Sequence, residues 1–490
     1  MRRLNHATLT TVPPEVRSEL DPQGLSIGMV HLGVGGFHRA HQAVYNEQAM
    51  LATGQTRWGI TAVTQRGPTV RDQMRPQNSL YTLAVRDGSD TRYRVVPSVR
   101  EVLDGPSETE TVLSRIADPA VTVVTLTVTE KAYRLDPTTH RLDLTDPEIR
   151  ADAAGRNPQT LVGRLVAGFR RRRAADAGPL AVLSCDNLSD NGTLLRRAVT
   201  NYLGLLPDGD ALTAWIDQHV TFPSTMVDRI VPATTKEDRT MVASVLGLRD
   251  EAAVITEPFT QWVIEDNFRA PRPPWEAAGA LLVPDVRPYE QTKLRTLNAC
   301  HSLLAYLGAL AGIDTIAEAV AVDDFAAAAQ HMATSEAGPT LPTVAGIDHG
   351  EYVDSVLRRF TNPALGHTTR QVAADGSLKI GPRLLPTITA SLAQSIQPNV
   401  ATLTIAAWLR HTLQARTDAG TPVMVQEPAA ATMHQAARGR SGTRAVRPAL
   451  AAAGVPDELL DDRRFVTLVE QWYSHLAQAG ARAAARMAVA

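Results

Sequence analysis

The stretch Ser26-Ile-Gly-Met-Val-His-Leu-Gly-Val-Gly-Gly-Phe-His-Arg-Ala-His41 decides the fold of this chain of 490 residues. Residues 26–32 read as a short buried strand, residues 33–36 as a glycine turn, and a helical pattern continues to Met50. Strand, glycine turn and helix are typical of a site where a dinucleotide's diphosphate lies on N–H groups at a helix start. Taken alone, the stretch leaves two interpretations open: a dinucleotide-binding turn, or a glycine turn of purely structural meaning.

In the first interpretation Gly33 makes the tight turn and Gly35 lets the backbone approach a phosphate. The third glycine of the GxGxxG pattern would fall at position 38, which is a histidine. Cofactor contacts are expected from the turn and from two later strand ends, namely Gly33, Val34, Gly35, Gly36, Phe37, Arg66 and Glu130.

The strand predicted over 58–64 ends in Gln65 and Arg66. A typical NAD site has an Asp or Glu near this strand end to hold the ribose hydroxyls. Neither is present, and Arg66 could contact a 2′-phosphate. The preference between NAD and NADP therefore stays open.

Two further apolar stretches predict buried strands of a parallel sheet, 121–129 and 179–184. Ligands of open α/β sheets bind outside the carboxyl ends of the strands. Glu130 and Lys131 follow the first stretch, and Asn187 and Asn191 follow the second. A solvated loop and plain turn chemistry are the alternatives for these residues.

A second stretch, Lys293-Leu-Arg-Thr-Leu-Asn-Ala-Cys-His301, opens a strongly apolar helical run. On an α-helix with about 100° per residue, Lys293, His301 and Asn298 fall within roughly 140° of one another. An amine, an amide and an imidazole on one side of a helix can take a proton from an alcohol and hold the charge that develops on its oxygen. The alternative is a helix start whose polar residues face water.

Composition describes an ordinary globular protein, with 44% hydrophobic and 20% charged residues. The formal net charge of −2 gives no electrostatic reason to expect a nucleic-acid or membrane partner. Two cysteines, Cys185 and Cys300, are too few for a disulfide framework or a cysteine-built zinc site. We expect no secretory signal, because no apolar core follows Arg2 and Arg3, and no membrane span, because no apolar run approaches the roughly 18 residues that cross a bilayer. We expect a cytoplasmic protein that is a monomer or a weak oligomer.

Five motifs in order resemble the mannitol 2-dehydrogenase family of long-chain, metal-independent polyol dehydrogenases, which also contains fructuronate and tagaturonate reductases. The resemblance runs from about residue 28 to about residue 415. Its motifs are 31–42, Ser184-Cys-Asp-Asn187 with Asn191-Gly192, 222–232, Lys293-x4-Asn298-x2-His301, and Asp375-Gly-Ser-Leu-Lys379.

The resemblance implies a Rossmann-type cofactor-binding domain over residues 1–285 and a mostly α-helical domain over 286–490, with the substrate between them. It makes Lys293 the general base, Asn298 and Asn191 an oxyanion pocket, His301 the group that orients substrate hydroxyls, and Glu290 a proton relay. Substrate contacts are expected from Lys131, Asn187, Asp228 and Arg370. NAD is the implied cofactor, with NADP not excluded, and no metal is implied. The absence of a His-Glu-x-x-His motif agrees with metal-free chemistry.

Two departures bear on the substrate. Mannitol-specific members typically read Glu-Gly-Gly-Tyr where this chain reads Glu130-Lys-Ala-Tyr133, and they carry an arginine where this chain has Gln371. A cation at position 131 would suit a substrate carboxylate. The leading expectation is a dehydrogenase of the D-mannitol/D-fructose type, the alternative is a D-fructuronate reductase (D-mannonate oxidoreductase), and a non-catalytic sugar or nucleotide sensor is the second alternative.

Overall fold

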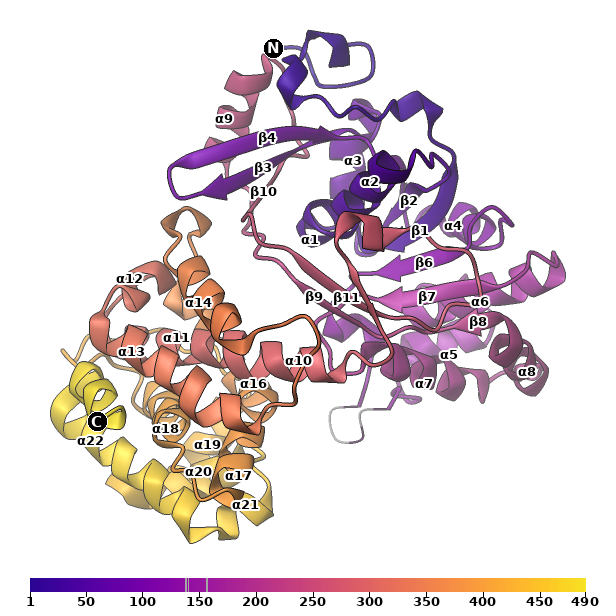
Figure 1. Ribbon diagram of the computed structural model, residues 1–490. Helices are drawn as coiled ribbons and strands as arrows, with labels where there is room; N and C mark the ends of the chain where they lie inside the picture. The colour runs from indigo at the N-terminus through magenta and orange to yellow at the C-terminus, as the bar shows by residue number, and fades with distance from the viewer. Residues whose placement is uncertain (137–138, 140, 156) are drawn as a thin grey trace. The chain divides into compact units, whose positions relative to one another are not determined.

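The computed structural model describes residues 1–136, 139, 141–155 and 157–490, and it divides into two compact units (Figure 1). Met1–Arg287 is built around parallel strands with flanking helices, and Pro288–Ala490 is largely helical. The predicted fold class, a Rossmann-type α/β domain followed by a mostly helical domain, is confirmed.

The first unit is organised by a six-stranded parallel sheet in the order β5-β2-β1-β6-β7-β8. In chain order along the sheet this is 3-2-1-4-5-6, the arrangement of doubly wound dinucleotide-binding folds. Its strands are β1 (Ile27–Leu32), β2 (Gly59–Thr64), β5 (Val99–Asp104), β6 (Val123–Leu126), β7 (Leu180–Ser184) and β8 (Val220–Thr221). All strands run the same way, so their carboxyl ends meet at one edge of the sheet.

Successive side chains of each strand point to opposite faces, and both faces are covered by apolar residues. On β1, Met29 belongs to one buried cluster, while Val30 and Leu32 belong to another. The helices of this unit are α1 (Gly36–Ala40), α2 (Gln42–Thr53), α3 (Thr69–Met74), α4 (Thr109–Ile116), α5 (Pro147–Ala153), α6 (Leu161–Ala174), α7 (Asn191–Leu203), α8 (Gly209–His219) and α9 (Lys236–Leu246). Helix α2 supplies the first cluster, and α4, α6 and α7 supply the second. This is why the strands read as nearly continuous apolar runs.

Two smaller three-stranded sheets complete the first unit, in the orders β10-β3-β4 and β12-β11-β9. Their strands are β3 (Tyr81–Asp87), β4 (Asp90–Val96), β9 (Thr225–Asp228), β10 (Val254–Thr256), β11 (Gln261–Glu265) and β12 (Leu281–Val283). A separate apolar cluster joins the amino-terminal segment, β4 and α9 (Figure 1).

The second unit is a helical assembly around one large apolar core. Its α-helices are α10 (Arg287–Lys293), α11 (Ala299–Ala311), α12 (Ile316–Val320), α13 (Asp323–His331), α14 (His349–Phe360), α15 (Thr369–Ala373), α16 (Gly376–Arg383), α17 (Leu385–Ala393), α18 (Asn399–Gln414), α19 (Ala430–Ala437), α20 (Val446–Ala452), α21 (Asp457–Asp461) and α22 (Arg463–Ala488). Helix α11 is buried along almost its whole length, so the segment that begins with Lys293 is anchored in this core.

Candidate active site

The glycine turn after β1 is shaped by a very close approach of two backbones. Gly33 has a left-handed φ of 102°, and a Cβ at this position would lie 2.1 Å from the carbonyl oxygen of Thr127. Gly35 differs, because its φ is −94° and the nearest atom to a Cβ there would be 3.8 Å away. Packing within the protein therefore requires a glycine at 33, whereas at 35 the missing side chain leaves open space.

Helix α1 starts at Gly36, directly after this turn. The first N–H groups of a helix have no partner inside the helix. The N–H groups of Gly33 and Val34 bond to the carbonyl of Val63, and that of Gly35 bonds to the carbonyl of Gly33. The donors that the turn can offer to an anion therefore come from Gly36 and Phe37 rather than from the first three residues.

The end of β2 carries no carboxylate where a ribose would be held. Gln65 accepts a hydrogen bond from Nη1 of Arg164 at 2.9 Å, so its side-chain oxygen is bound to a residue of α6. Arg66 is exposed, and its Nη2 lies 3.3 Å from Oγ1 of Thr129. Arg66 thus remains accessible at the carboxyl edge of the sheet.

The predicted residues at the ends of β6, β7 and β9 differ in their exposure to solvent. Glu130, Lys131 and Asn187 are exposed at the carboxyl ends of these strands. Asp228, the last residue of β9, is 5% exposed.

Asn191 is completely buried at the start of α7. Its Nδ2 donates to the carbonyls of Asp186 and Thr225, and its Oδ1 accepts from the N–H of Thr225. Both amide protons are therefore used to tie α7 to the ends of β7 and β9. This geometry gives no support to the expected oxyanion role of Asn191, whereas the exposed Asn187 lies four residues earlier on the same strand end.

A buried network beside Asn187 was missed by the sequence reasoning. The Tyr133 hydroxyl donates to Oδ2 of Asp186 at 2.7 Å and contacts Oγ of Ser184 at 2.6 Å. Burial raises the pKa of Asp186, with the hydrogen bonds from Tyr133 and the Thr129 N–H acting against it. Tyr133 belongs to the stretch Glu130-Lys-Ala-Tyr133 and Asp186 to the motif Ser184-Cys-Asp-Asn187. Only the pairing of β6 with β7 brings the two residues together.

In the second unit, the segment of Lys293 differs from the expected regular α-helix. A π-helical turn, Leu294–Asn298, lies between α10 and α11, and the N–H of Ala299 bonds to the carbonyl of Leu294, five residues earlier. In such a turn, residues five apart lie near the same face, as residues four apart do on an α-helix. Lys293 and Asn298 are five apart, and His301 follows by three on α11. The α-helical angle expected between Lys293 and Asn298 was therefore wrong, and the π turn brings the predicted trio closer to one face.

Arg295, which lies within the π turn, connects it to two other segments of the second unit. It is 5% exposed, and its Nε donates to Oγ1 of Thr387 at 2.9 Å. The guanidinium also donates to the carbonyl of Thr340 at 3.2 Å and to the Thr340 hydroxyl. These hydrogen bonds tie the π turn to Thr340 and Thr387, and burial lowers the pKa of Arg295. The sequence marked it only as a helix residue.

Lys293, Glu290 and Asn298 are all at most 8% exposed. The ring of His301 stacks on those of Phe360 and His367, at centroid distances of 4.9 and 5.6 Å. Burial holds the pKa of His301 well below its usual range, and His367 and nearby cations lower it further. His301 is therefore a neutral imidazole that can donate at one nitrogen and accept at the other.

Comparisons with known proteins match both units. Residues 27–277 match the mannitol dehydrogenase Rossmann domain, and residues 285–477 match the mannitol dehydrogenase C-terminal domain. The chain belongs to the mannitol dehydrogenase family.

Relatives of this family member carry more than one name. It is 38% identical to D-mannonate oxidoreductase of Escherichia coli, over 96% of this chain and 97% of the relative. It is 34% identical to mannitol 2-dehydrogenase of Pyrenophora tritici-repentis, over 98% of this chain and 85% of the relative. The solved ternary complex of Pseudomonas fluorescens mannitol 2-dehydrogenase with NAD and D-mannitol superposes with a TM-score of 0.87 at 32% identity and covers 99% of both chains.

Three residues in or near the Asp-Gly-Ser motif of this mannitol dehydrogenase family member differ in their surroundings. Arg370 is exposed on α15. Gln371 completes a capping box with Thr368 at the start of the same helix, so its amide is engaged locally. Lys379 donates to the carbonyls of Val372 and Ala374. Gln371 therefore serves as a helix-capping residue.

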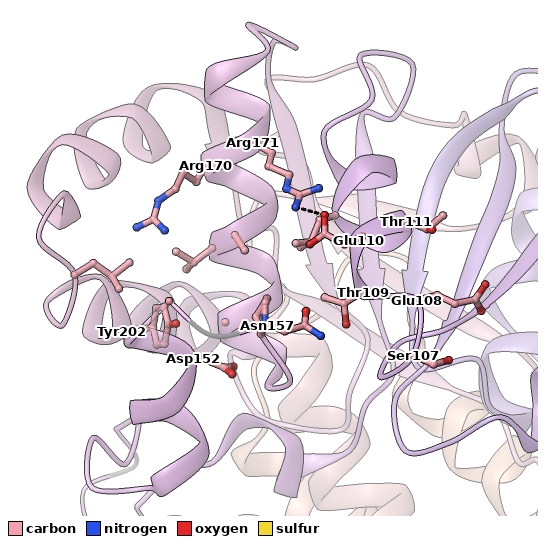
Figure 2. A pocket seen from close by; sticks show the side chains of 17 residues that line it. Ser107, Glu108, Thr109, Glu110, Thr111, Asp152, Asn157, Arg170, Arg171 and Tyr202 are labelled. Atoms are coloured by element: carbon pink, nitrogen blue, oxygen red, sulfur yellow. Dashed lines mark hydrogen bonds and ion pairs between the residues drawn. The ribbon is translucent and has the colours of Figure 1, made fainter.

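A pocket of about 610 Å³ in the first unit contains none of the predicted site residues. Figure 2 shows its lining, including Tyr202 on α7 and the ion pair between Arg171 and Glu110 that spans from α6 to α4. Elsewhere in the described residues, no group of three or more His, Cys, Asp or Glu side chains is arranged to hold a metal ion. No helix among them is both long enough and apolar enough to cross a membrane.

Proposed function

We propose that this protein is an NAD(P)-dependent, metal-independent secondary-alcohol dehydrogenase that interconverts a polyol and a ketose of the D-mannitol/D-fructose type. One observation carries the proposal: the π turn that places the buried Lys293 and Asn298 near one face in a chain of the mannitol dehydrogenase family. A binding protein without turnover has no need of a buried amine beside an amide and a neutral imidazole, so the sensor interpretation is less well supported.

The glycine turn fits a dinucleotide. The open space at Gly35 is the kind that a side chain would fill, and the Gly36 and Phe37 N–H groups are donors suited to a diphosphate. Residues Gly33 to Phe37 would hold the diphosphate, and Arg66 is accessible for a ribose or its phosphate. When bound, a nicotinamide cofactor supplies the hydride acceptor for alcohol oxidation.

The chain's own residues have separate tasks in this proposal. Lys293 takes the hydroxyl proton of the alcohol, and Asn298 donates to the oxygen as charge develops on it. His301, held by its ring contacts, orients neighbouring hydroxyls of the substrate. Glu290, one helical turn before Lys293, receives the proton from the lysine and passes it to solvent.

A D-fructuronate reductase is the second candidate, and a specific observation favours it. Lys131 is exposed at the carboxyl end of β6, where a cation could form charge-assisted hydrogen bonds to a sugar carboxylate. The relative named D-mannonate oxidoreductase covers nearly the whole chain, which makes an acid substrate worth testing beside the polyols.

The test is to mix the purified protein with NAD⁺ or NADP⁺ and a panel containing D-mannitol, D-sorbitol and D-mannonate, and to follow NADH or NADPH absorbance. The proposal expects reduction of NAD⁺ by at least one polyol, unchanged after treatment with a chelator. Reduction by D-mannonate alone would establish the second candidate, and flat traces with every substrate and both cofactors would support the sensor. Activity that a chelator abolishes would contradict the metal-free chemistry.

A further inference from the structure

The carbonyl of Gly33 is held by three donors. The N–H of Gly35 and the hydroxyl of Thr127 both donate to it at 2.7 Å, and Nε2 of His31 lies 3.3 Å away. His31 is fully buried, so the carbonyl that it contacts is directed into the protein. The electronegative oxygen of the turn is thereby kept off the surface on which an anion would lie.

His31 is wedged between two threonines of the neighbouring strand segment. Its Nδ1 lies 2.7 Å from Oγ1 of Thr125, and its Nε2 lies 2.9 Å from Oγ1 of Thr127. The Gly33 carbonyl can only accept, so Nε2 carries the proton and Nδ1 accepts from Thr125. Burial lowers the pKa of His31 to about 3, in keeping with this neutral tautomer. One imidazole therefore links β1, the end of β6 and the glycine turn.

The His31 ring also packs against His38, the residue at the position of the motif's missing third glycine. His38, at that position, is fully buried and stacks on His31 with ring centroids 3.4 Å apart and an angle of 13° between the planes. Neither ring nitrogen of His38 has a hydrogen-bond partner among the described residues. A third glycine normally lets the helix pack closely on its strand. Here the contact between α1 and β1 is made by two stacked imidazoles instead.

We propose that His31, acting through Thr127, is a positioning residue of the cofactor site: it fixes the Gly33 carbonyl inward and supports α1 through His38. The inference rests on the proposed function, because it presupposes a dinucleotide at this turn. It assigns to a buried histidine of β1 and to the threonine that follows β6 a role in cofactor affinity rather than in stability alone.

The experiment measures the Kd for NADH by fluorescence titration in four variants of the full-length protein. Thr127→Val removes one donor to the Gly33 carbonyl and should weaken NADH binding by about two- to tenfold, the range for one hydrogen bond. His31→Phe keeps a ring against His38 but removes the polar contacts with Thr125, Thr127 and the Gly33 carbonyl, and should weaken binding at least as much. Because both changes act on one carbonyl, the double variant should bind NADH no more than about twofold more weakly than the worse single variant. Thr127→Ser, which keeps the hydroxyl, should restore the wild-type Kd to within about twofold.

The matched control is Thr61→Val on β2 of the same sheet. Thr61 is fully buried, whereas Thr127 is half-buried, and the Thr61 hydroxyl donates to Oε2 of Glu101 at 2.9 Å, away from the glycine turn. It should lower the melting temperature without changing the Kd for NADH. If Thr127→Val and His31→Phe likewise lower only the melting temperature, the inference is overturned while the proposed function stands. If the wild-type protein itself does not bind NADH, the proposed function fails, and the inference fails with it.

Discussion

Substituting alanine for each of two glycines in the turn should separate folding from cofactor binding. Gly33→Ala places a Cβ 2.1 Å from the Thr127 carbonyl oxygen on a backbone with a φ of 102°. A strained left-handed residue and overpacking against backbone each cost about 1–3 kcal/mol, so the free energy of unfolding should fall by about 2–6 kcal/mol. Gly35→Ala meets no atom closer than 3.8 Å and has a φ that alanine adopts readily. Its stability should be unchanged or raised by up to about 1 kcal/mol.

Gly35→Ala, although it should leave stability unchanged or raised, should weaken NADH binding. If a diphosphate approaches the backbone there, the added methyl group occupies its space, and the Kd for NADH should rise at least about tenfold, or roughly 1.4 kcal/mol. Urea unfolding followed by circular dichroism and NADH fluorescence titration give the two quantities. Gly24→Ala is the control, because a Cβ there meets nothing closer than 3.6 Å and the residue lies outside the turn. A Gly35→Ala variant that binds NADH as tightly as the wild type would refute the assignment of this turn to a dinucleotide.

Three further outcomes are expected. Thr387→Val leaves the buried Arg295 short of one acceptor, so it should destabilise the protein by about 1–3 kcal/mol in urea unfolding and lower kcat. Thr404→Val, which loses a bond to its own helix and a weak contact with the Met332 sulfur but none with Arg295, should leave kcat unchanged. Burial raises the pKa of Glu336 to about 7, so the folded state holds this proton more tightly, and the contribution of Glu336 to stability falls as the pH rises from about 4.5 to about 7. Buried histidines such as His31 act in the opposite sense, because their lowered pKa favours the unfolded state at low pH. The stabilisation of the wild type relative to Glu336→Gln should therefore shrink over this pH range, and a difference that does not change with pH would exclude Glu336 as a source of the pH dependence. Lys131→Ala should lower kcat/KM for D-fructuronate by about ten- to a hundredfold and leave D-fructose nearly unaffected if Lys131 binds a carboxylate, whereas equal losses on both substrates would contradict that role.

The strand, turn and helix around Gly33 could be predicted because their signals are local. A buried apolar run, glycines and a helical pattern follow one another within 25 residues, and the structure places β1, the turn, α1 and α2 there. The strand predicted over 121–129 was too long, since β6 covers only Val123–Leu126. After Leu126 the chain leaves the strand at the point where Thr127 approaches the Gly33 backbone. Periodicity alone does not mark such a contact.

The features that could not be predicted depend on pairing or on unusual backbone geometry. The contacts of His31 with Thr125 and Thr127 need the register of β1 against β6, which a single sequence does not encode locally. The π turn after Lys293 has no distinctive composition, so a regular α-helix was the natural expectation. The resemblance implied an oxyanion role for Asn191, which stays a prediction; its hydrogen bonds to Asp186 and Thr225 depend on tertiary contacts that its motif does not reveal.

The most direct test of the account is the effect of Lys293→Ala on turnover of the preferred substrate. The variant should lower kcat by at least about a hundredfold, the lower range for general acid–base catalysis, while the Kd for NADH stays within about twofold of the wild type. Lys236→Ala, which removes an exposed lysine at the start of α9, is the matched control and should keep full activity. A Lys293→Ala variant that turns over within a few-fold of the wild type would remove this residue from the chemistry and contradict the proposed mechanism.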